Sequence, residues 1–123
     1  MSYATPLHNL DARGEPLGRL MVTICGSTRF RAEIAEANRV LTLAGHLVLA
    51  PGVFAHDGDE ITDLEKRCLD ILHFEKIERS DAVYIVNPGG YIGESTRREI
   101  EYARNLNKPI TFLVPETDGA VTW

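Results

Sequence analysis

Short apolar runs alternate with segments of helical periodicity along most of this chain. The apolar runs are rich in Val, Ile and Leu, and they span residues 20–25, 46–50, 82–86 and 109–114. Helical spacing of apolar residues predicts helices over 29–44, 62–79 and 94–107. Because strands of a parallel sheet are buried on both faces by the helices that connect them, this alternation indicates a parallel α/β sheet.

Right-handed crossovers arrange these elements as a three-layer Rossmann-like or flavodoxin-like sandwich with four or five parallel strands. The length of 123 residues fits one domain. We expect residues 1–19 to form an irregular arm and 20–123 to form that domain. Ligands bind such sheets beyond the carboxyl ends of the strands. The loops at 26–29, 51–63 and 87–96 are therefore predicted to meet there.

Composition excludes several classes of function. A net charge of −5 without clustered Lys and Arg argues against a nucleic-acid partner. No apolar run reaches the ~18 residues of a membrane span, and the N-terminus lacks a signal-peptide pattern. Cys25 and Cys68 form no CxxC pair, so we expect neither a disulfide scaffold nor a metal site. We also expect no cofactor and a location in the reducing cytoplasm. The expected state of Cys25 is a buried thiol.

The first loop, Gly26-Ser27-Thr28-Arg29, joins a predicted strand to a predicted helix. Its small residues allow a ligand to approach the backbone, and a helix N-terminus attracts an anion. The hydroxyls add hydrogen-bond donors, and Arg29 can hold a phosphate by two parallel bonds. Alternatively, Ser27 or Thr28 caps the helix. Neither a Walker A motif nor GxGxxG is present, so neither an NTPase nor a dinucleotide dehydrogenase is indicated.

The loop after the third apolar run is rich in glycine. Residues 87–93 read NPGGYIG, which has more glycine than a tight turn needs. The glycines leave backbone N–H groups free to face a ribose or a phosphate. The alternative is a flexible connection. The candidate ligand contacts in this loop and at the helix start after it are Asn87, Gly89, Gly90, Gly93, Ser95 and Thr96.

Thr96 and Glu99 have a spacing with two interpretations. Thr-x-x-Glu at a helix start is a capping box, in which the glutamate bonds back to the N–H of the cap. A functional Glu99 would instead point into the cleft, where the helix dipole favours its ionised form. An ionised, positioned carboxylate can attack an anomeric carbon. The spacing alone leaves both interpretations open.

Asp70 and His73 lie three residues apart and therefore share one face of the second predicted helix. Surface polar residues are the simpler interpretation of this pair. The segment 56–60, HDGDE, is expected to be a solvated acidic loop rather than a cation site, and it could close over a substrate. Thr62 and Glu65 predict a capping box at the start of that helix. Asp81 is expected to cap backbone at the start of the third strand.

Several segments resemble the nucleoside 2-deoxyribosyltransferase-like superfamily, and the resemblance spans roughly residues 22–113. The matching segments are Gly26-Ser27-Thr28-Arg29, Ser80-Asp81 and Ser95-Thr96-Arg97-Arg98-Glu99-Ile100-Glu101-Tyr102-Ala103. Pro88-Gly89-Gly90-Tyr91 and Thr96-x-x-Glu99 are also similar to the two halves of the PGGxGTxxE motif of cytokinin-activating phosphoribohydrolases. Both resemblances imply cleavage of an N-glycosidic bond.

The resemblance implies that Glu99 attacks the anomeric carbon and that water or a second base resolves the glycosyl ester. The arginine of the first loop resembles the branch that hydrolyses nucleoside 5′-monophosphates. Family members place an Asp at the position of His73, which here would donate a proton because its ordinary pKa lies near neutrality. Asp70 is the other candidate for handling protons. A homodimer is also implied. The alternative is a non-catalytic nucleotide-binding module, which His73 and Glu101, at a position usually held by Gly, would suit.

Overall fold

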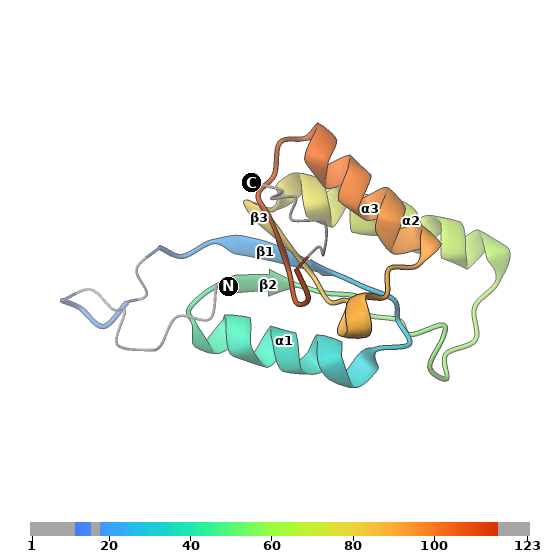
Figure 1. Cartoon of the computed structure of the whole chain (residues 1–123), viewed down its shortest axis with the longest axis horizontal. Coiled ribbons are helices and arrows are strands. Elements are labelled where there is room, and N and C mark those ends of the chain that lie inside the picture. Colours follow the sequence, from blue (N-terminus) through green and yellow to red (C-terminus); the bar gives the residue numbers. More distant parts are fainter. Residues whose placement is uncertain (1–11, 16–17, 116–123) are drawn as a thin grey trace.

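A computed structural model describes residues 12–15 and 18–115. Its centre is a four-stranded parallel sheet in the order β2-β1-β3-β4 (Figure 1). In chain order the strands are β1 (Met21–Cys25), β2 (Leu47–Leu49), β3 (Ala82–Ile85) and β4 (Ile110–Phe112). The predicted α/β class and parallel sheet are confirmed, whereas most of the predicted arm over 1–19 lies outside the described residues.

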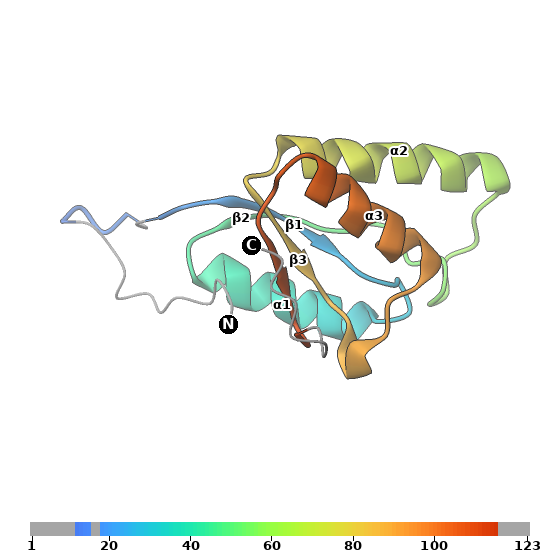
Figure 2. The same cartoon turned by 45° about the horizontal axis from the view of Figure 1, so that its top comes forward.

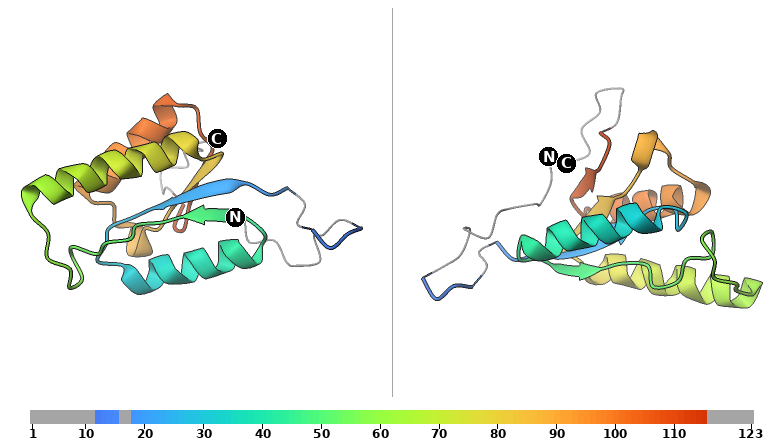
Figure 3. Two further views of the ribbon diagram at one scale, coloured as in Figure 1. Left: turned by 180° about the vertical axis from the view of Figure 1, so that it is seen from behind. Right: turned by 90° about the horizontal axis from the view of Figure 1, so that it is seen from below.

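Helices cover both faces of this sheet. They are α1 (Arg31–Leu43), α2 (Asp63–Arg79) and α3 (Glu94–Asn105). α1 lies on one face, and α2 and α3 lie side by side on the other (Figures 1 and 2). Views from behind and from below show the same three layers (Figure 3). None of the described helices combines the length and the apolar character that crossing a membrane requires.

The strands contribute alternate side chains to two separate cores, as the pleat of a strand requires. Ile24 packs against Ile34 in the core beneath α1. Its neighbour Cys25 points the other way and packs with Ile77 and Ile100 beneath α2 and α3. The thiol at the end of β1 therefore lies in the α2–α3 layer.

The strand order reverses between β1 and β3. The second strand in the chain, β2, pairs with one edge of β1, and the third, β3, pairs with its opposite edge. The two strands stay paired to their ends, where the N–H of Val86 donates to the carbonyl of Cys25 at 2.8 Å. A Cβ at Gly26 would lie 2.7 Å from the Val86 carbonyl oxygen, so only glycine fits this approach. Open α/β sheets bind ligands at such a reversal.

The helix ends differ from the predicted ends by a few residues. The helix predicted over 29–44 begins at Arg31, because the N–H of Phe30 closes a turn onto the Ser27 carbonyl at 3.0 Å. The helix predicted over 94–107 ends at Asn105, and Asn107 adopts a left-handed φ of 59°. Asp81 precedes β3 as predicted, but the backbone that its side chain caps belongs to the neighbouring strand, because its Oδ2 accepts the N–H of Met21 at the start of β1 at 2.8 Å.

The capping box predicted at the start of α2 is confirmed. The Thr62 Oγ1 accepts the Glu65 N–H at 3.1 Å, and the Glu65 carboxylate accepts the Thr62 N–H at 2.9 Å. We expect Thr62→Ala to lower the free energy of unfolding by about 1 kcal/mol, because the helix start loses its cap. Urea unfolding of both proteins measures the difference. The exposed Thr42→Ala inside α1 is the control, and an equal loss there would contradict a capping effect.

Candidate active site

A cavity of about 420 Å³ opens beyond the carboxyl end of β1, between the first loop, the loop after β2, α2 and the start of α3. This volume lies within the range of small-molecule sites. Most of the residues that the sequence predicted to form a site line this cavity. They are Gly26, Ser27, Thr28, Arg29, Asp70, His73, Gly93, Ser95, Thr96 and Glu99. Ala55 and His56 show that the loop between β2 and α2 also borders the cavity.

Glu99 points into the cavity instead of capping its own helix. The N-cap of α3 is Gly93, which makes no side-chain cap bond, and Thr96 lies within the first turn, where it is buried. Glu99 consequently falls in the second turn, too far along α3 for a capping box. Its side chain is only 13% exposed and lines the cavity. The geometry thereby excludes the capping interpretation.

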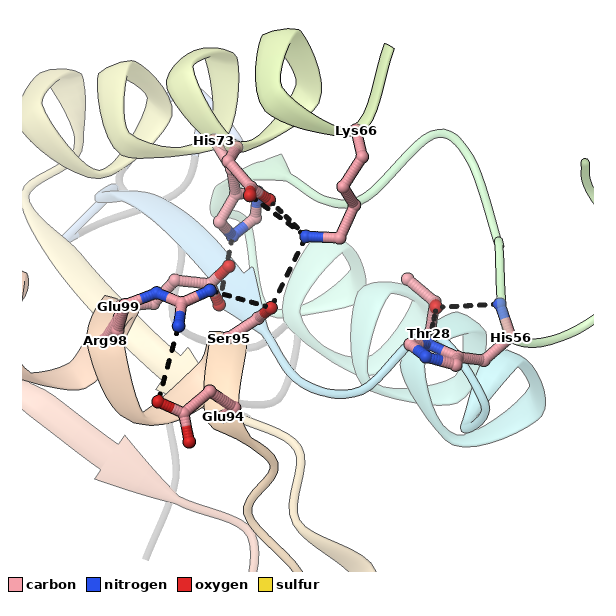
Figure 4. A network of polar contacts seen from close by, with 9 residues as sticks. Thr28, His56, Lys66, His73, Glu94, Ser95, Arg98 and Glu99 are labelled. Atoms are coloured by element: carbon pink, nitrogen blue, oxygen red, sulfur yellow. Dashed lines mark hydrogen bonds and ion pairs between the residues drawn. The ribbon is translucent and has the colours of Figure 1, made fainter. Parts of the chain in front are cut away.

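Three polar side chains from separate elements meet at the floor of this cavity. The His73 Nε2 of α2 lies 3.4 Å from the Cys25 Sγ of β1. The same nitrogen lies 3.8 Å from the Glu99 Oε1 of α3. Figure 4 shows His73 and Glu99 facing each other across the gap between the two helices. His73 is thus a buried partner of Glu99 and not a surface residue.

Burial sets the protonation of this cluster. It raises the pKa of Glu99 to about 7, although a hydrogen bond from the Cys25 thiol opposes the rise. It lowers the pKa of His73 to about 4, and the positive charge of Lys76 adds to that fall. At pH 7 Glu99 is therefore ionised only in part, because burial outweighs the helix dipole that was expected to favour its ionised form. The expectation of a near-neutral pKa for His73 is wrong, and this imidazole is neutral at pH 7.

Asp70 lies on the cavity wall in an ion pair with Lys66. The Lys66 Nζ contacts both carboxylate oxygens, at 2.8 and 2.9 Å, and reaches the Ser95 Oγ at 3.5 Å. The guanidinium of Arg98 also donates to this Oγ at 3.4 Å. Figure 4 shows Lys66, Ser95 and Arg98 as one polar network linking α2 to the start of α3. The Asp70 side chain is 34% exposed, and it lines the cavity as the ion-pair partner of Lys66.

The side chains of the first loop line one wall of the cavity and do not cap α1. The N-cap of α1 is Phe30, so the capping interpretation of Ser27 and Thr28 is wrong. The Arg29 Nε donates to the Ser27 Oγ at 3.1 Å, and its guanidinium lies 4.7 Å from the centre of the Tyr91 ring. The Thr28 Oγ1 contacts the His56 Nδ1 at 2.9 Å, which ties the loop between β2 and α2 to the cavity (Figure 4).

The cavity thus combines a buried carboxylate with a wall that carries the cations Arg29 and Lys66. Its rim includes the N-terminus of α3, which favours an anionic group. Comparisons with family models, curated proteins and solved structures find no match to this chain. Its ligand must therefore be inferred from these side chains.

Asn87, Gly89 and Gly90 were predicted as ligand contacts, but none of them lines the cavity. The Asn87 amide is buried and joins the end of β3 to the segment after β4, donating to the Val114 carbonyl at 3.0 Å and accepting its N–H at 2.9 Å. Gly89 and Gly90 have φ values of 66° and 83°, which the tight turn there requires. These three residues determine the conformation of the loop after β3 and do not contact the cavity.

The residues at the cavity that sequence reasoning did not assign to a site include Cys25, His56, Lys66 and Tyr91. The spacing of Lys66 and Asp70, one helical turn apart, was a usable signal for their ion pair. The other contacts join distant segments, and no local pattern predicts them.

Proposed function

We propose that this protein cleaves the N-glycosidic bond of a nucleoside or nucleoside 5′-monophosphate, with Glu99 as the nucleophile. The observation that carries the proposal is a buried carboxylate that faces a cavity of suitable size instead of its own main chain. Nucleophilic attack on a sugar requires such a positioned carboxylate. The cations of the wall suit the phosphate of a nucleotide.

The proposed reaction has two steps. In the first, a Glu99 oxygen bonds to the anomeric carbon while the C–N bond breaks, and the base leaves with the electron pair and takes a proton from water. In the second, water attacks the same carbon and releases Glu99 as a carboxylate, while Asp70 accepts the proton of that water and returns it to the hydroxide left by the first step. A second base in place of water would give transfer instead of hydrolysis.

The phosphate is assigned to the first loop, where the Arg29 guanidinium is oriented by Ser27 and Tyr91. We expect Arg29→Met to lower kcat/KM for a nucleoside 5′-monophosphate by about 10–100-fold, the effect of losing one or two charge-assisted hydrogen bonds. Cleavage of the nucleoside without phosphate should change little. Steady-state kinetics on both substrates measure the difference. Arg39→Met, on the exposed face of α1, is the control, and equal losses on the two substrates would count against the assignment.

The experiment that tests the function is incubation of the purified protein with a panel of nucleosides and their 5′-monophosphates, followed by chromatography for free base. Release of a base from at least one compound supports the proposal. Failure to release any base, with a nucleotide still raising the melting temperature, favours a nucleotide-binding module without catalysis. That second candidate has its own support in His73, which packs against Cys25 where the resembling family has an acid.

The homodimer and the cytoplasmic location implied earlier remain parts of this proposal. Large apolar side chains of α2, Leu64, Ile71 and Leu72, are more than half exposed and offer a surface for a second copy. Cys25 and Cys68 are both free thiols, as a reducing compartment would keep them.

A further inference from the structure

We propose that Cys25, His73 and Glu99 form a binding site for one zinc ion at the floor of the cavity. Each residue offers one ligand atom, and the three atoms lie within 4.8 Å of one another. They come from β1, α2 and α3, so the fold and not a local motif brings them together. Thiolate, imidazole and carboxylate are the protein ligands that zinc uses.

Two of the three separations between these atoms are close to those of a tetrahedral zinc centre. Bond lengths of about 2.3 Å to sulfur and about 2.0 Å to nitrogen and oxygen require ligand separations of roughly 3.3–3.6 Å. The Cys25 Sγ and His73 Nε2 are 3.4 Å apart, and the His73 Nε2 and Glu99 Oε1 are 3.8 Å apart. The third pair, the Cys25 Sγ and a Glu99 carboxylate oxygen, lies within 4.8 Å. An ion would therefore fit once rotation of the Glu99 side chain brings its oxygen toward the sulfur.

Charge balance also favours a divalent ion. Zinc with one thiolate, one carboxylate and one neutral imidazole is neutral overall, and a buried site tolerates a neutral centre better than an isolated charge. Binding breaks the S–H bond of Cys25 and releases its proton to water, as metal binding to a thiol requires. Cys25 is completely buried, whereas His73 and Glu99 line the cavity. The fourth coordination position would consequently face the cavity.

Zinc binding and the proposed reaction compete for Glu99. A carboxylate oxygen that coordinates zinc cannot bond to an anomeric carbon, so zinc should inhibit base release and a chelator should restore it. This consequence rests on the proposed function, whereas the metal site itself does not. The simpler alternative is that Cys25, His73 and Glu99 contact one another and bind no metal.

The test is a titration of the chelator-treated full chain with Co²⁺, which reports a cysteine ligand by a thiolate-to-cobalt charge-transfer band. We expect the band to saturate at one equivalent and to disappear when Zn²⁺ is added. Cys25→Ser and His73→Asn should each lose it, whereas the exposed Cys68→Ser should keep it. Circular dichroism checks that the variants are folded.

Absence of the band in the folded wild-type protein overturns the proposal, whatever the variants do. A band that survives Cys25→Ser and vanishes in Cys68→Ser overturns it as well. Base release is measured separately, with chelator and with added Zn²⁺. A cobalt band without base release under either condition supports the metal site and contradicts the glycosidase, and base release without a band does the reverse.

Discussion

Replacing Glu99 by glutamine is expected to lower base release by roughly 10³-fold or more, as loss of a covalent nucleophile does in other enzymes. The amide keeps the size of the side chain and can still accept the hydrogen bond from Cys25. It carries no negative charge and cannot form the glycosyl ester. The step that it loses is therefore chemical, and substrate binding should be preserved.

Chromatographic rates for wild type and Glu99→Gln, together with nucleotide affinity by calorimetry, measure this effect. Glu101→Gln is the matched control, because Glu101 is an exposed glutamate on the same helix and does not line the cavity. Rapid quenching of the wild type followed by mass spectrometry should also find a glycosyl adduct on Glu99. Undiminished base release by Glu99→Gln would end the assignment of the nucleophile.

Gly26→Val is expected to lower the free energy of unfolding by about 3 kcal/mol, the upper end of the usual cost of overpacking. A Cβ at this position would lie 2.7 Å from the Val86 carbonyl oxygen and 3.3 Å from the Val86 Cβ. The carbonyl belongs to the backbone just beyond β3 and cannot rotate away. The clash would push apart the strand ends that frame the cavity, so base release should fall too.

Thermal unfolding measures the change, and a loss of this size corresponds to a drop in melting temperature of roughly 10 °C. Gly52→Val is the control for stability, because no atom lies within 4 Å of a Cβ there. A melting temperature for Gly26→Val equal to that of the control would show that the strand ends separate without cost.

The helices and strands follow from patterns within single segments, and the structure confirms them to within a few residues. Apolar runs and helical spacing predict the order of elements, and the rules for parallel crossovers then predict the edge where the loops meet. Gly26, Thr28 and Arg29 were found in this way, and they line the cavity. Asn87 and Gly89 were predicted in the same way and do not line it, because a turn and a binding loop use the same residue types.

By itself, the sequence determined the α/β class, a candidate site beyond the carboxyl ends of the strands, and Glu99 as a candidate carboxylate. Only the tertiary structure decided that Glu99 faces the cavity and that Cys25 and His73 accompany it. Local periodicity predicts which face of an element is buried, but not which other element covers that face. The contacts of Cys25, His73 and Glu99 depend on how α2 and α3 pack over β1, and this packing is set by the whole core rather than by any one segment.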